Sequence, residues 1–295
     1  MSVPTVPAKT VVSGYIRNGW FGVSYNMNIY RGCPHGCIYC DSRSDCYGID
    51  DFDTVRAKEA ALSVIERDLK SKRKTGSIMT GSMNDPYNHF ESECLLTRGA
   101  LKLVDKYSFG INIITKSTLV TRDIDVLKSI MRHSPVAVNL TITTFDDELC
   151  KKLERFAPPS SERFLALEAL ADAGVPCGIT LMPVLPFIND DDENVLSIVR
   201  RAAECGVKWI EAGFGVTLRQ GQREYFYDRL RELFPGMRER YIAQYGDTYS
   251  CHSPRREQLW NSFSSECRRL GIACTHNEIL EIIHSGYKDE QTALF

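Results

Sequence analysis

Short runs of apolar residues alternate with longer amphipathic segments over most of the chain. The apolar runs predict strands at 24–30, 77–81, 111–116, 136–143, 176–183 and 207–213. The amphipathic segments between them predict helices at 55–72, 93–107, 122–132, 146–156 with 161–173, and 191–205. Six strand–helix units in succession predict a parallel sheet, either open or curled into a partial barrel.

The two ends of the chain differ from this pattern. Residues 1–23 are rich in Pro and Gly and are expected to form an irregular lead-in to a barrel domain at 24–220. Residues 221–295 change to helices with polar connectors, predicted at 222–234, 238–244, 255–270 and 277–285. No flexible linker separates this helical C-terminal extension from the barrel, so we expect it to pack on the sheet and close one side of the site.

The segment 33–40 directly follows the first predicted strand and carries Cys33, Cys37 and Cys40. Three converging thiolates favour a soft metal, and an iron–sulfur cluster normally takes four protein ligands, so a triad indicates a cluster with one open iron. The alternatives are unligated cysteines in a turn, or a zinc site with His35 as its fourth ligand. Because sites in such sheets gather at the carboxyl ends of strands, the loop is expected at the active rim.

The overall composition narrows the classes of protein. A formal net charge of -2 argues against a protein that coats nucleic acid through charge alone. No apolar run is long enough to span a bilayer, and residues 1–10 lack the order of a signal peptide. Eleven cysteines in such a chain indicate reduced thiols and metal ligation. We therefore expect a cytoplasmic protein without a membrane partner.

The spacing Cys-x3-Cys-x2-Cys, with Tyr39 directly before the last cysteine, resembles the signature of the radical S-adenosylmethionine (SAM) superfamily. Further segments resemble its spore photoproduct lyase branch and DNA-repair-photolyase-like relatives, namely 28–40, 81–87, 115–117, 140–144 and 183–190. The resemblance implies an α/β fold, a partial (β/α)6 TIM-like barrel. It also implies a [4Fe–4S] cluster on Cys33, Cys37 and Cys40, with S-adenosylmethionine on the fourth iron. Reductive cleavage of S-adenosylmethionine then gives a 5′-deoxyadenosyl radical that takes a substrate hydrogen atom.

The resemblance also implies which side chains hold S-adenosylmethionine near the cluster. Ser82, Met83 and Asp85, at the end of the second strand, would contact its amino group. The alternative for Asp85 is a turn with the proline that follows it. Lys116, at the end of an otherwise apolar strand, would meet the cofactor carboxylate.

Four more residues are candidates for the rest of the cofactor. Tyr39 would pack on its adenine side. Thr141 and Thr143, which share a face of the fourth strand under period-two alternation, would bind the ribose or the carboxylate. Arg163 would reach the carboxylate, with a solvated arginine as the alternative.

The chain departs from spore photoproduct lyase in one respect. In that family a cysteine near the second-strand motif returns a hydrogen atom to the product, whereas residues 81–84 here contain none. Cys46, six residues past the cysteine loop, is the candidate catalytic thiol donor, and Cys94 and Cys177 are others. The alternative for each is a small buried apolar residue.

Three cysteines in the extension raise the question of a second cluster. Cys251, Cys267 and Cys274 are widely spaced, and such spacing rarely specifies a site. We leave a second cluster as an open alternative.

The function predicted from the resemblance is hydrogen abstraction by a radical SAM enzyme, served by a reductant such as flavodoxin or ferredoxin. By family analogy the first substrate candidate is a nucleic-acid or nucleoside lesion, and a peptide or small metabolite is the alternative. One alternative of another class is a non-catalytic, zinc-stabilised nucleic-acid-binding module. Another is a scaffold that binds S-adenosylmethionine without cleaving it.

Overall fold

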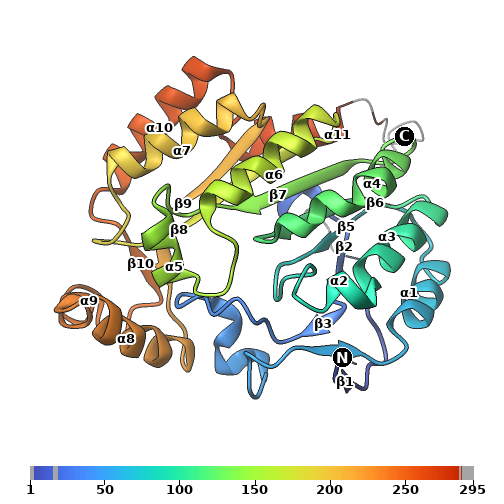
Figure 1. Cartoon of the computed structure of the whole chain (residues 1–295), viewed down its shortest axis with the longest axis horizontal. Helices are drawn as coiled ribbons and strands as arrows, with labels where there is room; N and C mark the ends of the chain where they lie inside the picture. Colours follow the sequence, from blue (N-terminus) through green and yellow to red (C-terminus); the bar gives the residue numbers. More distant parts are fainter. Residues whose placement is uncertain (1–2, 16–18, 286, 288–295) are drawn as a thin grey trace.

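A curved sheet of seven strands forms the centre of the structure, a computed structural model that describes residues 3–15, 19–285 and 287 (Figure 1). Its order is β10-β9-β8-β7-β6-β5-β2, with every neighbouring pair from β2 to β9 parallel and β10 antiparallel to β9. The strands are β2 (Tyr25–Met27), β5 (Ser77–Thr80), β6 (Gly110–Thr115), β7 (Val136–Thr141), β8 (Cys177–Val184), β9 (Trp209–Thr217) and β10 (Ser250–His252). The predicted α/β half-barrel with six parallel strands is confirmed.

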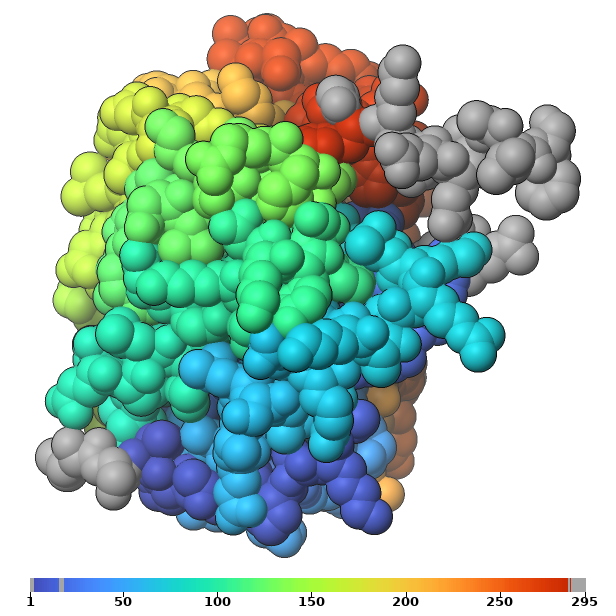
Figure 2. Space-filling model, turned by 90° about the vertical axis from the view of Figure 1, so that its right-hand side faces the viewer, coloured from blue at the N-terminus to red at the C-terminus, as the bar shows by residue number. Residues whose placement is uncertain are grey.

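Helices cover the outer face of the sheet and follow one another in chain order (Figures 1 and 2). They are α1 (Ala61–Lys70), α2 (Glu91–Cys94), α3 (Leu96–Lys106), α4 (Ile124–Ile130), α5 (Asp147–Leu153), α6 (Ser160–Asp172) and α7 (Asp192–Glu204). Because the helices cover one face and the barrel interior covers the other, every residue of β5, β6 and β7 is buried. This explains why these strands are nearly continuous apolar runs in the sequence.

The C-terminal extension forms four helices, at the places that the sequence predicts, with α10 beside α7 (Figure 1). They are α8 (Gln222–Leu233), α9 (Met237–Tyr245), α10 (Arg256–Leu270) and α11 (His276–His284). Ile279 and Ile283 of α11 pack with Phe21 and Trp209 in an apolar cluster that also contains the barrel residues Met79 and Ile114. The extension thus contributes to the core, while the predicted domain boundaries stay a prediction.

Within residues 3–15, 19–285 and 287, the structure contains no helix that combines the length and the apolar character needed to span a bilayer.

Two predicted helices begin differently in the structure. The segment 55–72 starts as a strand, β4 (Arg56–Lys58), which pairs with β1 (Thr5–Val6) and β3 (Tyr30–Arg31) in a small second sheet. The helix α1 begins only at Ala61, after Ala60 adopts a left-handed conformation with φ 47°. The predicted helix 93–107 is likewise divided, because Leu95 has φ 51°. Local backbone conformations of this kind override a continuous amphipathic pattern.

Gly81, directly after β5, offers a test of how closely the strand ends pack. Its φ is +97°, and a β carbon there would lie 1.8 Å from the carbonyl oxygen of Ile114. We expect Gly81→Ala to lower the free energy of unfolding by about 2–4 kcal/mol, from overpacking and left-handed strain together. Gly174→Ala is the control, because its φ is +76° but its β carbon would meet no described atom within 4 Å. Equal losses in urea unfolding would contradict the close approach.

Candidate active site

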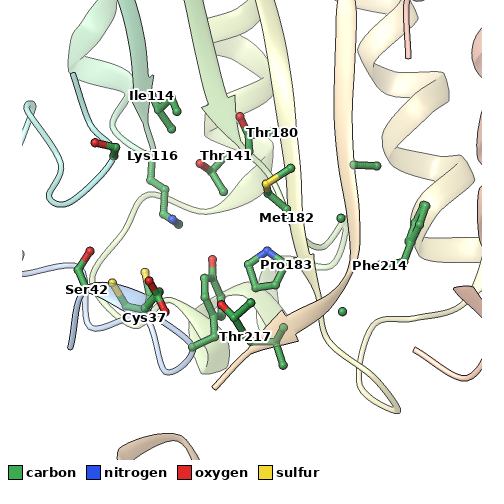
Figure 3. A pocket seen from close by; sticks show the side chains of 18 of the residues that line it. Cys37, Ser42, Ile114, Lys116, Thr141, Thr180, Met182, Pro183, Phe214 and Thr217 are labelled. Atoms are coloured by element: carbon green, nitrogen blue, oxygen red, sulfur yellow. The ribbon is translucent and has the colours of Figure 1, made fainter. Parts of the chain in front are cut away.

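A cavity of about 1080 Å³ opens where the parallel strands end, with Lys116 and Cys37 on one side of it (Figure 3). Its wall comes from the cysteine loop, the ends of β5 to β9, and the C-terminal extension. The cysteine triad, Cys33, Cys37 and Cys40, lines it. So do these predicted cofactor residues: Tyr39, Ser82, Met83, Asp85, Lys116 and Thr141. The structure thus brings together groups that lie far apart in the sequence.

The cysteine loop, residues 33–40, is held by its backbone against the segment that follows α5. The amide of Ile38 donates to the carbonyl of Leu153 at 2.9 Å, and the amide of Phe156 donates to the carbonyl of His35 at 3.0 Å. The loop donates one of these bonds and accepts the other, so both tie it to the segment that follows α5. The thiols are therefore carried on an ordered backbone at the rim of the cavity.

The thiols of the triad lie in a buried environment beside one cation. Burial raises the pKa of Cys33 to about 12 and also raises the pKa of Cys37 and of Cys40, while the ammonium of Lys116 opposes the increase for the last two. Burial alone would lower the pKa of Lys116, but Cys37 and the carboxylate of Glu154 favour its charged form and raise it overall. Lys116 is thus the cation that most strongly opposes the effect of burial on Cys37 and Cys40.

Among the described residues, no group of three or more His, Cys, Asp or Glu side chains is arranged to hold a metal ion. The triad instead borders open space, and an iron–sulfur cluster held there would be bound by these thiolates. A soft, thiolate-only donor set fits such a cluster.

Asp85 joins the cysteine loop to the ends of β5 and β6. One of its carboxylate oxygens accepts from the Thr115 hydroxyl at 2.6 Å and from the Tyr87 amide at 2.8 Å. The other accepts from the Lys116 amide at 2.8 Å and lies 2.9 Å from Nε2 of His35. Burial would raise the pKa of Asp85, but the His35 ring and these hydrogen bonds lower it to about 2. Asp85 therefore makes the bonds expected of a turn residue, as the alternative proposed. Nε2 of His35 faces the carboxylate of Asp85.

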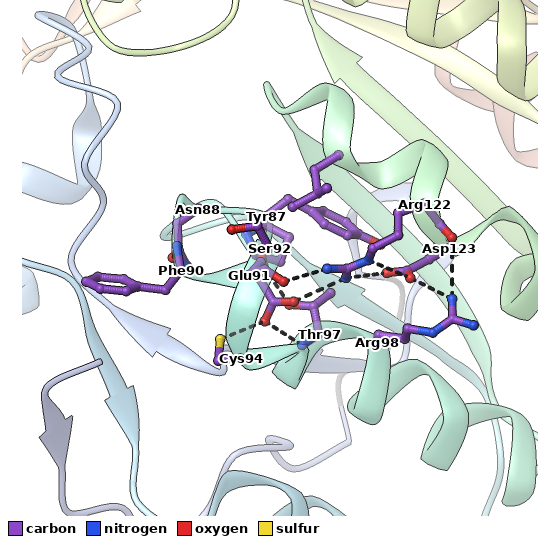
Figure 4. Close-up of polar contacts among 12 residues, drawn as sticks. Tyr87, Asn88, Phe90, Glu91, Ser92, Cys94, Thr97, Arg98, Arg122 and Asp123 are labelled. Carbon is purple, nitrogen blue, oxygen red and sulfur yellow. Dashed lines mark hydrogen bonds and ion pairs between the residues drawn. The ribbon is translucent and has the colours of Figure 1, made fainter. Parts of the chain in front are cut away.

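A buried ionic network stabilises the turn that carries Asp85 (Figure 4). Nη2 of Arg122 lies 3.2 Å from Glu91 and 2.8 Å from Asp123, and both carboxylates have 0% exposure. The amide of Thr97 donates to Glu91 at 2.6 Å, and its hydroxyl donates to the carbonyl of Pro86 at 2.6 Å. The turn that carries Asp85 is thereby tied to α3.

A second buried carboxylate, Glu154, lies on the other side of the cysteine loop. It accepts a hydrogen bond from the Tyr39 hydroxyl, and its backbone forms an antiparallel bridge with Cys37. Arg163 pairs with it at 2.5 Å, and both side chains are fully buried. Arg163 also donates to the carbonyl of Thr141 at 2.8 Å. Burial would raise the pKa of Glu154, but the guanidinium outweighs it and lowers that pKa.

The structure corrects the expectations for Arg163 and Thr143. Arg163 is neither solvated nor on the cavity, because its donors are taken by Glu154 and by backbone carbonyls. Thr143 lies beyond the end of β7, so the alternation that places Thr141 on the cavity does not reach it. Its hydroxyl lies 3.4 Å from Glu154. Neither residue is carried into the proposed cofactor site.

The candidate thiol donors lie away from the cavity. Cys46 is exposed, with its sulfur 3.5 Å from the guanidinium of Arg219, and it does not line the cavity. Cys94 lies beside the Tyr30 hydroxyl at 3.1 Å, and Cys177 is buried in β8. Among the described residues that line the cavity, the cysteines are those of the triad.

Cys267 and Cys274 of the extension contact each other, but Cys251 lies apart from them. Cys251 belongs to the apolar cluster around α8 and α9, whereas Cys267 and Cys274 belong to the main core. Their placement gives no support to a second cluster.

The sequence interpretation missed two parts of the cavity wall. Thr180, one strand from Thr141, lines the cavity, and its buried hydroxyl has no hydrogen-bond partner among the described residues. Side chains from outside the parallel strands also line it, namely Trp20, His252, Arg256, Glu257, Trp260 and Asn261. A tryptophan on the polar side of a predicted amphipathic helix was the available signal for the second group.

A half-barrel with a cysteine-bordered cavity at its strand ends defines the class of radical SAM enzymes. Residues 27–199 match the family model described as the Radical SAM superfamily, which is more than half of the chain, and the chain belongs to that superfamily. The cofactors of this family are a [4Fe–4S] cluster and S-adenosylmethionine, and they are the cofactors of this chain.

Relatives and solved structures resemble the chain over most of its length. An uncharacterized protein of Mycobacterium tuberculosis is 30% identical over 75% of this chain and 67% of its own length. An uncharacterized protein of Methanocaldococcus jannaschii is 35% identical over 57% of this chain and 63% of its own.

Among solved structures, spore photoproduct lyase with bound S-adenosylmethionine and a dinucleoside spore photoproduct superimposes with a TM-score of 0.63 and 13% identity, covering 85% of this chain and 76% of that one. The radical SAM methyltransferase TsrM from Kitasatospora setae gives a TM-score of 0.54 and 12% identity, covering 86% of this chain and 52% of that one. Because both sequence identities are low, these two structural similarities support the fold of the chain only.

The ion pair behind the cysteine loop generates a stability prediction. We expect Glu154→Gln to lower the free energy of unfolding by about 3–5 kcal/mol, because it leaves Arg163 charged and unpaired in a dry environment. The double variant Glu154→Gln with Arg163→Met should recover part of that loss. Glu148→Gln is the control, because Glu148 and Lys151 are 78% and 60% exposed and such pairs contribute about 0–1 kcal/mol. Similar losses for the two single variants in urea unfolding would contradict the assigned role.

Proposed function

We propose that the chain is a radical SAM enzyme in which Cys33, Cys37 and Cys40 ligate three irons of the [4Fe–4S] cluster and leave the fourth for S-adenosylmethionine. The observation that carries this proposal is the cysteine triad itself, which faces a large cavity beside Lys116. When bound, the two cofactors supply one-electron cleavage of a carbon–sulfur bond and a carbon radical that takes a hydrogen atom from the substrate.

The residues of the chain bind and orient the cofactors. The ammonium of Lys116 offers a charge-assisted hydrogen bond to the cofactor carboxylate. Ser82, Met83 and Thr141, on the same cavity wall, are proposed for its amino group and ribose, and Tyr39 for its adenine side. Asp85 is proposed to position the loop, since both of its oxygens already accept bonds from the protein.

The reaction after hydrogen abstraction and the substrate are further expectations. Lesion repair in nucleic acid follows from the resemblance to the spore photoproduct lyase branch. A thiol that returns hydrogen is an ingredient of that reaction in the family, and the described cavity wall offers only the triad cysteines. A peptide or small metabolite is therefore the substrate class that the wall supports better. A flavodoxin- or ferredoxin-like reductant and a cytoplasmic location remain predictions.

The alternative of another class, a zinc-stabilised module without catalysis, makes a different prediction for the purified protein. Anaerobic purification should give a brown protein that absorbs near roughly 400 nm if the triad holds an iron–sulfur cluster. A colourless protein with stoichiometric zinc would support the alternative. A loaded cluster that never yields 5′-deoxyadenosine on reduction would instead indicate a scaffold.

The ligand assignment predicts that Cys37→Ala abolishes both cluster loading and S-adenosylmethionine cleavage, because two thiolates cannot replace three. Iron and sulfide content and 5′-deoxyadenosine formation are the measurements. Cys46→Ala is the matched control, since Cys46 is exposed and outside the cavity, and it should keep both. Unchanged iron content in Cys37→Ala would remove this residue from the ligand set.

The assignment of Lys116 predicts that Lys116→Ala weakens S-adenosylmethionine binding about tenfold through loss of a charged hydrogen bond, while iron content stays that of the wild type. Equilibrium dialysis of the reconstituted protein measures the affinity. Lys102→Ala, an exposed lysine of α3 outside the cavity, serves as the control. Equal affinity in both variants would exclude Lys116 from the cofactor site.

A further inference from the structure

The cavity extends well beyond the cysteine triad. The triad loop and α10 lie on different sides of the cavity: Figure 3 shows Cys37 on one side and Phe214 of β9, whose ring lies 5.8 Å from that of Phe263 in α10, on the other. Both line the same cavity of about 1080 Å³, which exceeds the range of about 300–1,000 Å³ usual for one ligand. With S-adenosylmethionine at the triad, the α10 end is left for the substrate.

One face of α10 forms this second end of the cavity. Arg256, Glu257, Trp260 and Asn261, here called the α10 wall, all line the cavity. These positions share one side of a helix with 3.6 residues per turn. They form a continuous surface.

A series of edge-on and tilted aromatic contacts anchors the α10 wall to the barrel. The ring of Trp260 lies 5.7 Å from the ring of Phe263, which lies 5.8 Å from the ring of Phe214 in β9. Trp260 is nevertheless 38% exposed. An indole that is fixed on one side and open on the other is suited to stack against a flat or apolar ligand.

The polar residues of the α10 wall differ from the others on the same helix. Arg255 pairs with Asp192 at 2.7 Å, and Glu266 pairs with Arg200 at 2.7 Å, so these residues dock α10 on α7. By contrast, the side chains of Arg256 and Glu257 make no hydrogen bond or ion pair with any residue that the structure describes.

Because neighbouring positions on a helix do not face each other, Arg256 and Glu257 do not pair with one another. Both charges are therefore available to a ligand.

The balance of charge on the α10 wall restricts the ligand. One guanidinium and one carboxylate give the wall no net charge, whereas a polyanion is bound by an excess of Lys and Arg. A ligand with one carboxylate and one ammonium matches both groups, because guanidinium binds carboxylate in a bidentate manner and carboxylate accepts from ammonium. The free amide of Asn261 adds a donor and an acceptor at the same site.

We propose that the α10 wall binds a free α-amino acid as the substrate. Its carboxylate pairs with Arg256, its ammonium with Glu257, and its side chain stacks on Trp260. This inference rests on the proposed function, because the bound amino acid is the molecule from which the hydrogen atom is taken.

Equilibrium dialysis tests the proposal on reconstituted protein with S-adenosylmethionine under anaerobic conditions. One chamber holds an equimolar mixture of the twenty free L-amino acids, a second holds the same amino acids N-acetylated and C-amidated, and a third holds a ten-nucleotide oligothymidylate. We expect retention of at least one free amino acid and of neither of the other probes. Retention of no free amino acid, or equal retention of its blocked form, would overturn the proposal, as would retention of the oligothymidylate instead.

Two variants and a control connect the retention to the α10 wall. Arg256→Gln and Glu257→Gln should each raise the Kd of the retained amino acid about tenfold or more, through loss of one charged pair. Arg268→Gln, an exposed arginine of the last turn of α10 outside the cavity, should leave the Kd unchanged. The same Kd in Arg256→Gln and Arg268→Gln would place the amino acid elsewhere and overturn the proposal.

Formation of 5′-deoxyadenosine without any amino acid separates the two proposals. Wild type and Arg268→Gln should produce it at equal rates on reduction. If the wild type produces it but retains no amino acid, only the substrate assignment fails. If the wild type produces none, the proposed function itself fails.

Discussion

Two buried carboxylates hold the cysteine loop in place, and the geometry of the site depends on them. Asp85 connects His35 to the ends of β5 and β6, and Glu154 connects the backbone and Tyr39 of the loop to Arg163. Each is ionised in a buried environment because cations and hydrogen bonds outweigh the cost of burial. The loop also packs Ile38 and Tyr39 in the apolar cluster around Leu153, and the ionic bonds add to this packing.

This arrangement explains how a member of the radical SAM superfamily divides its cavity. The fixed loop presents its thiols and Lys116 at one end, and the extension supplies the wall at the other end. The barrel sheet carries both ends, while α11 fills the interior with Ile279 and Ile283.

The sequence predicted the six parallel strands, most helices and the residues next to the triad, because strand periodicity and a short motif depend on neighbours in the chain. It did not predict the role of Glu154, which pairs with Tyr39 across 115 positions. Nor did it predict that Arg163 is buried, since burial of a charged side chain depends on a partner that only the folded chain supplies. Thr143 was misplaced because alternation holds only within β7. The cavity residues of α10 were missed because an amphipathic pattern does not distinguish solvent from a cavity.

The central claim is that the chain supplies three thiolates and leaves one iron for S-adenosylmethionine. The most direct test is electron–nuclear double resonance on the reduced, reconstituted protein with S-adenosylmethionine that carries magnetic isotopes at its amino nitrogen and carboxylate oxygens. The account predicts hyperfine coupling from both positions to the cluster. A fully loaded cluster that shows coupling to neither position would mean that a fourth protein ligand completes it, and would contradict the account.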